Sequence, residues 1–289
     1  MSNQFFNTHK RRWFPKVLIG SICLALAIAC LPILRAQYRS SLVGIAEWEV
    51  DPAFKHDVFI FARVRYSSYG GRGGYGRRGR GRWGGNWATD YPDAELNLAF
   101  RLQQMTSLKV SPEPVVVTLD QENLRDYPFL YIVEPGNMSF GETEVTNLRD
   151  YLLNGGFLMF DDFWGYDEWD NVYYEMKRVF PDREPIDLPI EHPIFHIVFD
   201  LKEKPQIPSI HHAISYRGTG RTWEREDAKV VHYRGIFDDD GRLMVLVCQN
   251  TDLGDGWERE GESEWYFHEF AEKKAYPMGI NIIFYVMTH

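Results

Sequence analysis

Acidic residues stand directly after apolar runs of the chain that are typical of β-strands. Asp161 and Asp162 follow the run 157–160, and Glu134 follows the run 129–133. Ligands of open α/β sheets bind beyond the carboxyl ends of the strands, so these acids are expected to face a binding cleft. The candidate ligand-binding residues are the acids and aromatic side chains at these ends and nearby: Asp90, Tyr91, Glu134, Asp161, Asp162, Trp164, Asp252, Asp255 and Trp257.

Paired carboxylates can serve two kinds of chemistry and one structural role. They can hold a hard cation or act as general acid and base, but aspartates also cap helices and form turns. Because Asp161 and Asp162 are adjacent, their side chains face different directions, and one can reach a ligand while the other caps a turn. The stretch 252–256 is open to the same interpretations. No catalytic residue, metal or cofactor is assigned on this basis.

The histidines do not have the spacing of a metal site. His192 and His196 are separated by Pro193, which excludes the spacing of a zinc-binding helix, and His211 and His212 are adjacent. Zinc needs three or four converging ligands. Structural or surface histidines are therefore expected, and zinc is not.

The apolar patterns predict an α/β fold with a mostly parallel sheet flanked by helices. The run 58–66 starts apolar and then alternates, as a strand does near a sheet edge. Short buried strands are expected at 115–119, 129–133, 157–160 and 243–248. Short apolar strands that alternate with amphipathic helices indicate a sheet covered on both faces.

Three helices have recognisable starts. The first opens at Pro92. Its apolar face is expected to carry Ala94, Leu98, Leu102 and Met105. A capping box of Ser139 and Glu142 opens the second, which ends at Gly155. Pro277 opens the last helix.

The first 36 residues are typical of a signal peptide or an N-terminal membrane anchor. They hold five basic residues and no acid, and residues 17–34 form an uncharged, mostly apolar run. Such a run after a positive segment is typical of a secretory signal and is long enough to span a bilayer. Residues 37–57 are interpreted as a linker, and 58–289 as one domain, irregular from about 181 to 242. The domain is expected on the extracytoplasmic, periplasmic side, either secreted or anchored to the inner membrane.

The net charge of the chain indicates which classes of partner are expected. The chain has a net charge of −9, and without the leader 27 basic and 41 acidic residues remain, a net charge of −14. Nucleic acid is not expected as a partner, because its phosphates would be repelled. A Gly/Arg-rich loop at 67–86 is expected to be a mobile, exposed arm that could contact a membrane surface, cell-wall polymer or the domain's own acids. Cys248 is expected as a buried core thiol.

A set of motifs resembles the bacterial family called domain of unknown function 4159 (DUF4159). The motifs are WATDYP (87–92), YPFLY (127–131), LRDYLLNGGF (148–157), DDFWG (161–165), HPIF (192–195), DLGDGW (252–257) and the ending 279–289. The resemblance covers 58–289. It implies a fold similar to the class I glutamine amidotransferases, which is flavodoxin-like. It also implies frequent membrane attachment and company with MoxR-type ATPases and von Willebrand factor A proteins. No activity is established for the family.

The comparison with amidotransferases bears on catalysis. Their nucleophilic cysteine sits in the turn after a central strand, where this sequence has Asp161 and Asp162. A carboxylate cannot replace the thiolate in the usual cysteine–histidine scheme, and Cys248 is on another strand. The expected function is a non-catalytic binding or scaffold domain of unknown ligand with a degenerate amidotransferase-like cleft. The alternative is a hydrolase that uses Asp161 or Asp162 with a histidine such as His192.

Overall fold

The computed structural model describes three stretches of the chain, residues 48–54, 57–68 and 86–289. All of them belong to the unit Ile45–His289, the second of two into which the chain divides. The predicted leader, 1–36, and most of the Gly/Arg-rich loop, 69–85, lie outside the described residues. Within the described stretches, no helix has the length and apolar character needed to cross a membrane.

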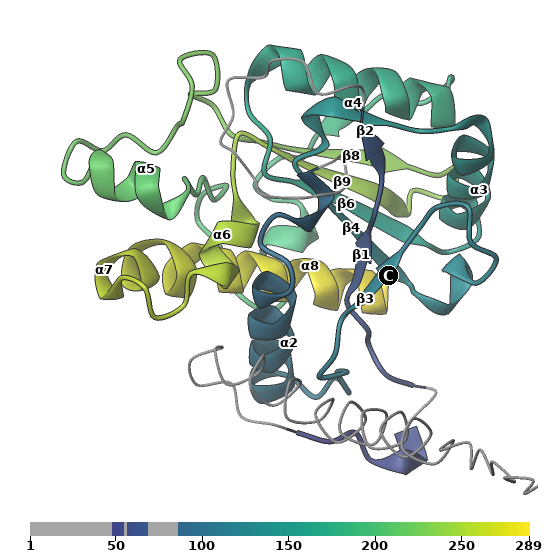
Figure 1. Cartoon of the computed structure of the whole chain (residues 1–289), viewed down its shortest axis with the longest axis horizontal. Coiled ribbons are helices and arrows are strands. Elements are labelled where there is room, and N and C mark those ends of the chain that lie inside the picture. The colour runs from purple at the N-terminus through teal and green to yellow at the C-terminus, as the bar shows by residue number, and fades with distance from the viewer. Residues whose placement is uncertain (1–47, 55–56, 69–85) are drawn as a thin grey trace, which may run out of the picture. The chain divides into compact units, whose positions relative to one another are not determined.

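A seven-stranded sheet with the order β3-β1-β4-β6-β9-β8-β7 forms the centre of this unit (Figure 1). Its strands are β1 (Ala62–Val64), β3 (Val115–Val117), β4 (Phe129–Val133), β6 (Phe157–Asp161), β7 (Ile186–Asp187), β8 (His232–Phe237) and β9 (Leu243–Gln249). The neighbours β3, β1, β4, β6 and β9 pair in parallel. Strand β8 pairs antiparallel with β9, and β7 pairs antiparallel with β8. The prediction of an α/β fold with a mostly parallel sheet flanked by helices is confirmed.

Helices cover both faces of the sheet (Figure 1). The α-helices of the described stretches are α2 (Asp93–Met105), α3 (Glu142–Leu153), α4 (Gly165–Val179), α5 (Ile210–Ser215), α6 (Leu253–Glu258), α7 (Glu264–Tyr266) and α8 (Tyr276–Thr288). Leu148 of α3 and Met176 of α4 pack in the core on one face, and Leu98 of α2 and Ile280 of α8 pack in the core on the other. Strands β4, β6 and β9 are buried along their whole length between these layers, which explains their continuous apolar sequences.

Strand β1 lies near a sheet edge, as predicted, because it pairs with the edge strand β3 on one side and with β4 on the other. Other local predictions are wrong. In β3, Val116 is 37% exposed rather than buried. Ser139 does not cap α3, because it lies in the short strand β5 (Met138–Ser139), which pairs with β2 (Ser67–Ser68). The helix begins after Gly141, whose N–H donates to the Glu144 carboxylate at 2.7 Å.

The region predicted to be irregular, 181–242, contains β7, α5 and the six-residue strand β8. Strand β8 pairs with β9 along its length, but Arg234 and Gly235 interrupt its apolar pattern in the sequence. Helix α4 was not predicted from the sequence, and neither was the π-helical segment Phe267–Ala275 that joins α7 to α8. Met105 departs from the predicted apolar face of α2 and is 52% exposed at the end of the helix.

Candidate functional site

Left-handed backbone is concentrated at the carboxyl edge of the sheet. Glu134 follows β4, Asp162 follows β6 and Asn250 follows β9, with φ angles of 46°, 52° and 63°. Asp90, in the segment before α2, has a φ angle of 62°. These are the non-glycine residues with positive φ in the described chain. Such backbone costs of order 1–3 kcal/mol per residue and clusters at functional sites.

Carboxylates from separate segments meet at this edge. We refer to Asp90, Glu134, Asp161, Asp162, Asp252, Asp255 and Glu258 as the acidic cluster. Asp90, Asp162 and Asp252 each place one carboxylate oxygen within 4.8 Å of the other two. Asp90, Asp255 and Glu258 form a second such group. The positions after strands and within motifs predicted every member except Glu258, which lies at the end of α6.

Asp252 and Asp255 accept hydrogen bonds from nearby backbone N–H groups and also belong to the groups of neighbouring carboxylates. Asp252 caps the start of α6, because its Oδ1 accepts the N–H of Asp255 at 2.7 Å. Asp255 in turn accepts the N–H of Ile210 and pairs with Arg259. The sequence left capping and ligand contact as alternatives, and one side chain can satisfy both because a carboxylate has two oxygens.

Asp161, at the end of β6, is the fully buried member of the cluster. Its Oδ2 accepts hydrogen bonds from the Tyr131 hydroxyl and from the Gly254 N–H, both at 2.9 Å. Within the described part of the chain, its Oδ1 has no hydrogen-bond partner. A Cβ atom on Gly254 would lie 2.8 Å from Asp90 Oδ2 and 3.0 Å from the Tyr131 hydroxyl. The glycine therefore allows the start of α6 to approach Asp90 and Tyr131 closely.

Burial and mutual repulsion disfavour the charged forms of the cluster. Burial raises the pKa of Asp161 to about 7 and that of Glu134 to about 7, although hydrogen bonds oppose both shifts. Burial and the neighbouring Asp255 raise the pKa of Asp90 to about 6. Burial raises the pKa of Asp162 well above its usual range, and Glu134 and Asp90 add to the effect.

The positive charge near the cluster is unevenly distributed. Arg259 Nε lies 3.1 Å from Asp255 Oδ1 and 2.7 Å from Glu258 Oε2, so the second group has a cationic partner. Burial and Asp90 still raise the pKa of Glu258 to about 9. Among the described residues, no arginine, lysine or histidine forms an ion pair with Asp90, Asp162 or Asp252.

A buried arginine positions the segment that carries Asp90. Arg63, in β1, donates through Nη1 to the backbone oxygens of Trp87 and Thr89, at 3.0 and 2.7 Å. Its Nε donates to Glu95 Oε1 at 2.5 Å, and both side chains are fully buried. The sequence does not predict this role of Arg63. The available signal is that Arg63 directly follows five apolar residues, 58–62, in the predicted strand.

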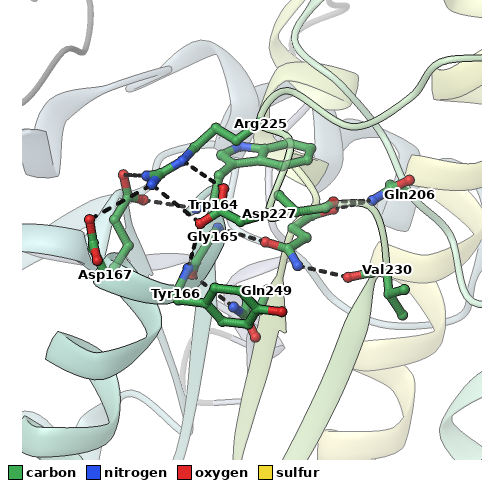
Figure 2. Close-up of polar contacts among 12 residues, drawn as sticks. Trp164, Gly165, Tyr166, Asp167, Gln206, Arg225, Asp227, Val230 and Gln249 are labelled. Carbon is green, nitrogen blue, oxygen red and sulfur yellow. Dashed lines mark hydrogen bonds and ion pairs between the residues drawn. The ribbon is translucent and has the colours of Figure 1, made fainter.

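A polar network holds the start of α4, shortly after Asp162 in the chain (Figure 2). The N–H of Gly165 donates to Asn250 Oδ1 at 2.8 Å, and the N–H of Tyr166 donates to Asp227 Oδ2 at 3.0 Å. Arg225 Nε lies 3.3 Å from Asp227 Oδ1, and its Nη1 lies 3.3 Å from Glu168 Oε1. These contacts fix the start of α4 against β9 and the segment before β8.

The predicted aromatic residues do not form a rim around the acids. Trp257 is 1% exposed, and its indole N–H donates to the Ala275 backbone oxygen at 2.9 Å. Trp164 is 6% exposed, and its indole N–H donates to Asp162 Oδ1 at 3.2 Å. Tyr91 is half-buried, with its ring centroid 6.3 Å from that of Trp87. The tryptophans therefore support the core and the turn.

The described histidines do not contact Asp161 or Asp162, and the cysteine is buried in the core. His192 packs on Phe237 and Tyr285, with ring centroids 6.2 and 5.5 Å away. Among the described histidines, none hydrogen-bonds or pairs with Asp161 or Asp162. Cys248 is fully buried in β9, as predicted, and burial followed by Asp161 raises its pKa well above the usual range.

A surface pocket of about 530 Å³ occurs elsewhere. It lies at the C-terminal ends of α3 and α4, and none of the acidic cluster lines it. Two of its residues, Arg149 and Arg183, already donate to the backbone oxygens of Val179 and Phe237. The acidic cluster remains the stronger candidate site because its polar groups are not fully satisfied.

The family model described as "Domain of unknown function (DUF4159)" matches residues 60–287. The matched range contains every residue of the acidic cluster, together with Arg63 and Glu95. No curated protein matches the sequence.

Proposed function

The chain belongs to the DUF4159 family, and we propose that its domain is a non-catalytic binding or scaffold module that holds its ligand at the acidic cluster. One observation carries the proposal. Asp90, Asp162 and Asp252 bring oxygens within 4.8 Å of one another, and no described cationic side chain pairs with them. Such crowding of negative charge is unfavourable unless the site takes up protons or a positively charged ligand. The ligand is therefore expected to be cationic.

The absence of an activated nucleophile among the described residues supports a non-catalytic role. Asp162 occupies a sharp turn between β6 and α4, the kind of position where hydrolases of this architecture place a nucleophile. A carboxylate there does not supply thiolate chemistry. Cys248 is inaccessible, and burial keeps its thiol protonated.

The alternative is a hydrolase that uses Asp161 or Asp162 with a histidine. The proximity of several carboxyls with raised pKa favours acid–base chemistry in principle. Among the described histidines, however, none contacts either aspartate, and His192 packs on Phe237 and Tyr285 instead. The binding role is therefore preferred.

The proposal includes the setting in which the domain works. The basic and apolar pattern of residues 1–36 supports export or anchoring on the extracytoplasmic side of the inner membrane. Membrane contact through the leader and the Gly/Arg-rich loop belongs to the same proposal. Partnership with MoxR-type ATPases and von Willebrand factor A proteins rests on the family resemblance.

A thermal-shift experiment on the purified full-length chain tests the binding role. The probes are CaCl₂, spermidine and a lysine-rich peptide, and at least one should raise the melting temperature of the wild type. The shift should be lost in the double variant Asp162→Asn/Asp252→Asn. It should persist in Asp239→Asn, which neutralises a carboxylate that is 93% exposed and pairs with Arg183.

A panel of p-nitrophenyl esters, phosphates and glycosides tests the alternative that the chain is a hydrolase. Turnover by the wild type that disappears in Asp162→Asn would support the hydrolase and overturn the binding role. A chain that responds to no cationic probe would also overturn it.

A further inference from the structure

We propose that Asp90, Asp162 and Asp252 form a binding site for a hard divalent cation, with Ca²⁺ as the best match. This inference rests on the proposed function and names the class of its ligand. The sequence left a hard cation open as one role of paired carboxylates and assigned no metal.

The geometry suits a single ion. One oxygen from each of the three carboxylates lies within 4.8 Å of the other two. Ca²⁺ binds oxygen ligands at about 2.3–2.6 Å, so two of its ligands can be separated by up to roughly twice that distance. One ion placed among the three oxygens can therefore contact all of them after small rotations of the side chains.

Unsatisfied oxygens within the cluster point independently to a ligand. Asp252 is only 3% exposed, and its Oδ1 accepts the Asp255 N–H. Its Oδ2 accepts no hydrogen bond from any described residue. Asp90 Oδ2 is also buried and receives no hydrogen bond from an N–H or a hydroxyl group of the described residues. A buried carboxylate oxygen without a donor, as at Asp90, is costly, and a coordinated cation removes that cost.

The donor atoms select the kind of metal. All three side chains offer carboxylate oxygens, which suit Ca²⁺, Mg²⁺ or Mn²⁺. Zinc sites typically include histidine or cysteine, and neither of the metal-ligand groups contains these residues. Ca²⁺ is preferred to Mg²⁺ because it accepts irregular oxygen sets, whereas Mg²⁺ demands near-ideal octahedral geometry at about 2.0–2.1 Å.

The second group of acids is a weaker candidate. Arg259 already contacts both Asp255 and Glu258, so its guanidinium supplies the positive charge that a metal would bring. No such partner is present for Asp162 or Asp252 in the described chain. Asp90 contributes to both groups and should turn toward the first when an ion binds.

Calorimetric titration of the full-length chain, stripped with EDTA, tests the site. CaCl₂ should bind with about one ion per chain and a Kd of about 1 mM or tighter. MgCl₂ should bind more weakly. Zinc binding without Ca²⁺ binding would overturn the proposal, and so would the absence of any Ca²⁺ response.

Substitutions by asparagine give matched variants that should still fold. Asp252→Asn retains a side chain that can cap the helix, and asparagine tolerates the positive φ of position 162. Asp162→Asn and Asp252→Asn should each weaken Ca²⁺ binding at least about tenfold, whereas Asp239→Asn should bind like the wild type. Equal Ca²⁺ affinity in all three variants would place the ion elsewhere and refute the site.

Melting temperatures separate loss of the site from loss of the fold. In EDTA, Asp162→Asn should melt at or above the wild-type temperature, because it relieves repulsion. At Ca²⁺ concentrations near 100 times Kd, the wild type should gain about 5 °C, and the variant should gain little. If spermidine or the lysine-rich peptide binds and Ca²⁺ does not, this inference fails while the proposed function stands. If no probe binds, both fail.

Discussion

Arg63 donates a 2.7 Å hydrogen bond from Nη1 to the backbone oxygen of Thr89, the residue that precedes Asp90. A side chain in the interior of the sheet therefore controls the position of a carboxylate at its edge. The Tyr131 ring lies 4.7 Å from the Arg63 guanidinium, and Glu95 supplies its counter-charge. Arg63 therefore both packs in the interior of the fold and helps to position Asp90 in the acidic cluster.

Replacing Arg63 with methionine should be strongly destabilising. The change leaves Glu95 buried without its partner, which typically costs about 3–5 kcal/mol. Urea unfolding measures the loss. The double variant Arg63→Met/Glu95→Leu should recover much of it, since it removes both charges. Equal instability of the single and double variants would show that packing rather than charge determines the cost.

Gly165 should not tolerate a side chain. Its φ is 83°, and a Cβ atom would lie 2.4 Å from Asp227 Oδ2 and 2.9 Å from Arg225 Nε. Gly165→Ala should lower the free energy of unfolding by about 2–4 kcal/mol, which combines backbone strain with disruption of the polar network.

Gly218 is the matched control, with a φ of 81° and no atom within 4 Å of the position that a Cβ would take. Gly218→Ala should cost about 1–2 kcal/mol, the penalty for left-handed backbone alone. Similar losses in the two variants, measured by chemical denaturation, would contradict the role assigned to the network in Figure 2.

Trp257→Phe should lower stability and leave ligand binding intact. The substitution removes the hydrogen bond to the Ala275 oxygen and leaves a void beside Gly279, where a Cβ would lie 2.8 Å from the indole. A loss of about 1–3 kcal/mol is expected on denaturation. Ca²⁺ affinity by calorimetry should match the wild type. A loss of Ca²⁺ affinity without a loss of stability would indicate that Trp257 takes part in ligand binding.

His192 should contribute to a loss of stability in acid. Burial, followed by the nearby His289, lowers the pKa of His192 below its usual value. The unfolded chain therefore binds the proton more readily, and stability present above about pH 6.5 declines as the pH falls toward the lower folded-state pKa.

Protonation would also remove the acceptor at His192 Nδ1, which receives the Ile194 N–H at 3.3 Å. His192→Asn keeps an acceptor without titrating. Denaturation between pH 5 and pH 8, a window around the usual histidine pKa of about 6.5, should show a smaller acid-side loss for the variant. An identical pH profile would show that His192 does not contribute.

The sequence predicts the central sheet well and its margins poorly. Strands β4, β6 and β9 are covered on both faces, so their apolar runs are unbroken and easily recognised. Strand β8 has helical or loop-like composition at Arg234 and Gly235, and its identity depends on pairing with β9. Pairing between segments is a tertiary property that a local pattern does not report.

The acidic cluster is also predictable only in part from the sequence. Asp162 and Glu134 follow strands, so topology alone brings them to one edge. The pattern cannot show which way an aromatic side chain turns, and Trp257 points into the core. It also cannot reveal that Arg63 reaches the segment before Asp90, because those residues meet only after β1 joins the sheet.

The short strands at the two margins of the sheet affect the behaviour of the chain in concentrated solution. Strand β3 has three residues and β7 has two, whereas the long apolar strands β4, β6 and β9 are enclosed between neighbours. In β7, Asp187 also pairs with Lys204, which adds charge to that margin. Exposed strand edges serve as templates for intermolecular pairing, and short or charged edges suppress it. The arrangement protects the folded domain against edge-to-edge aggregation and confines that hazard to unfolded chains, in which β4 and β9 become accessible.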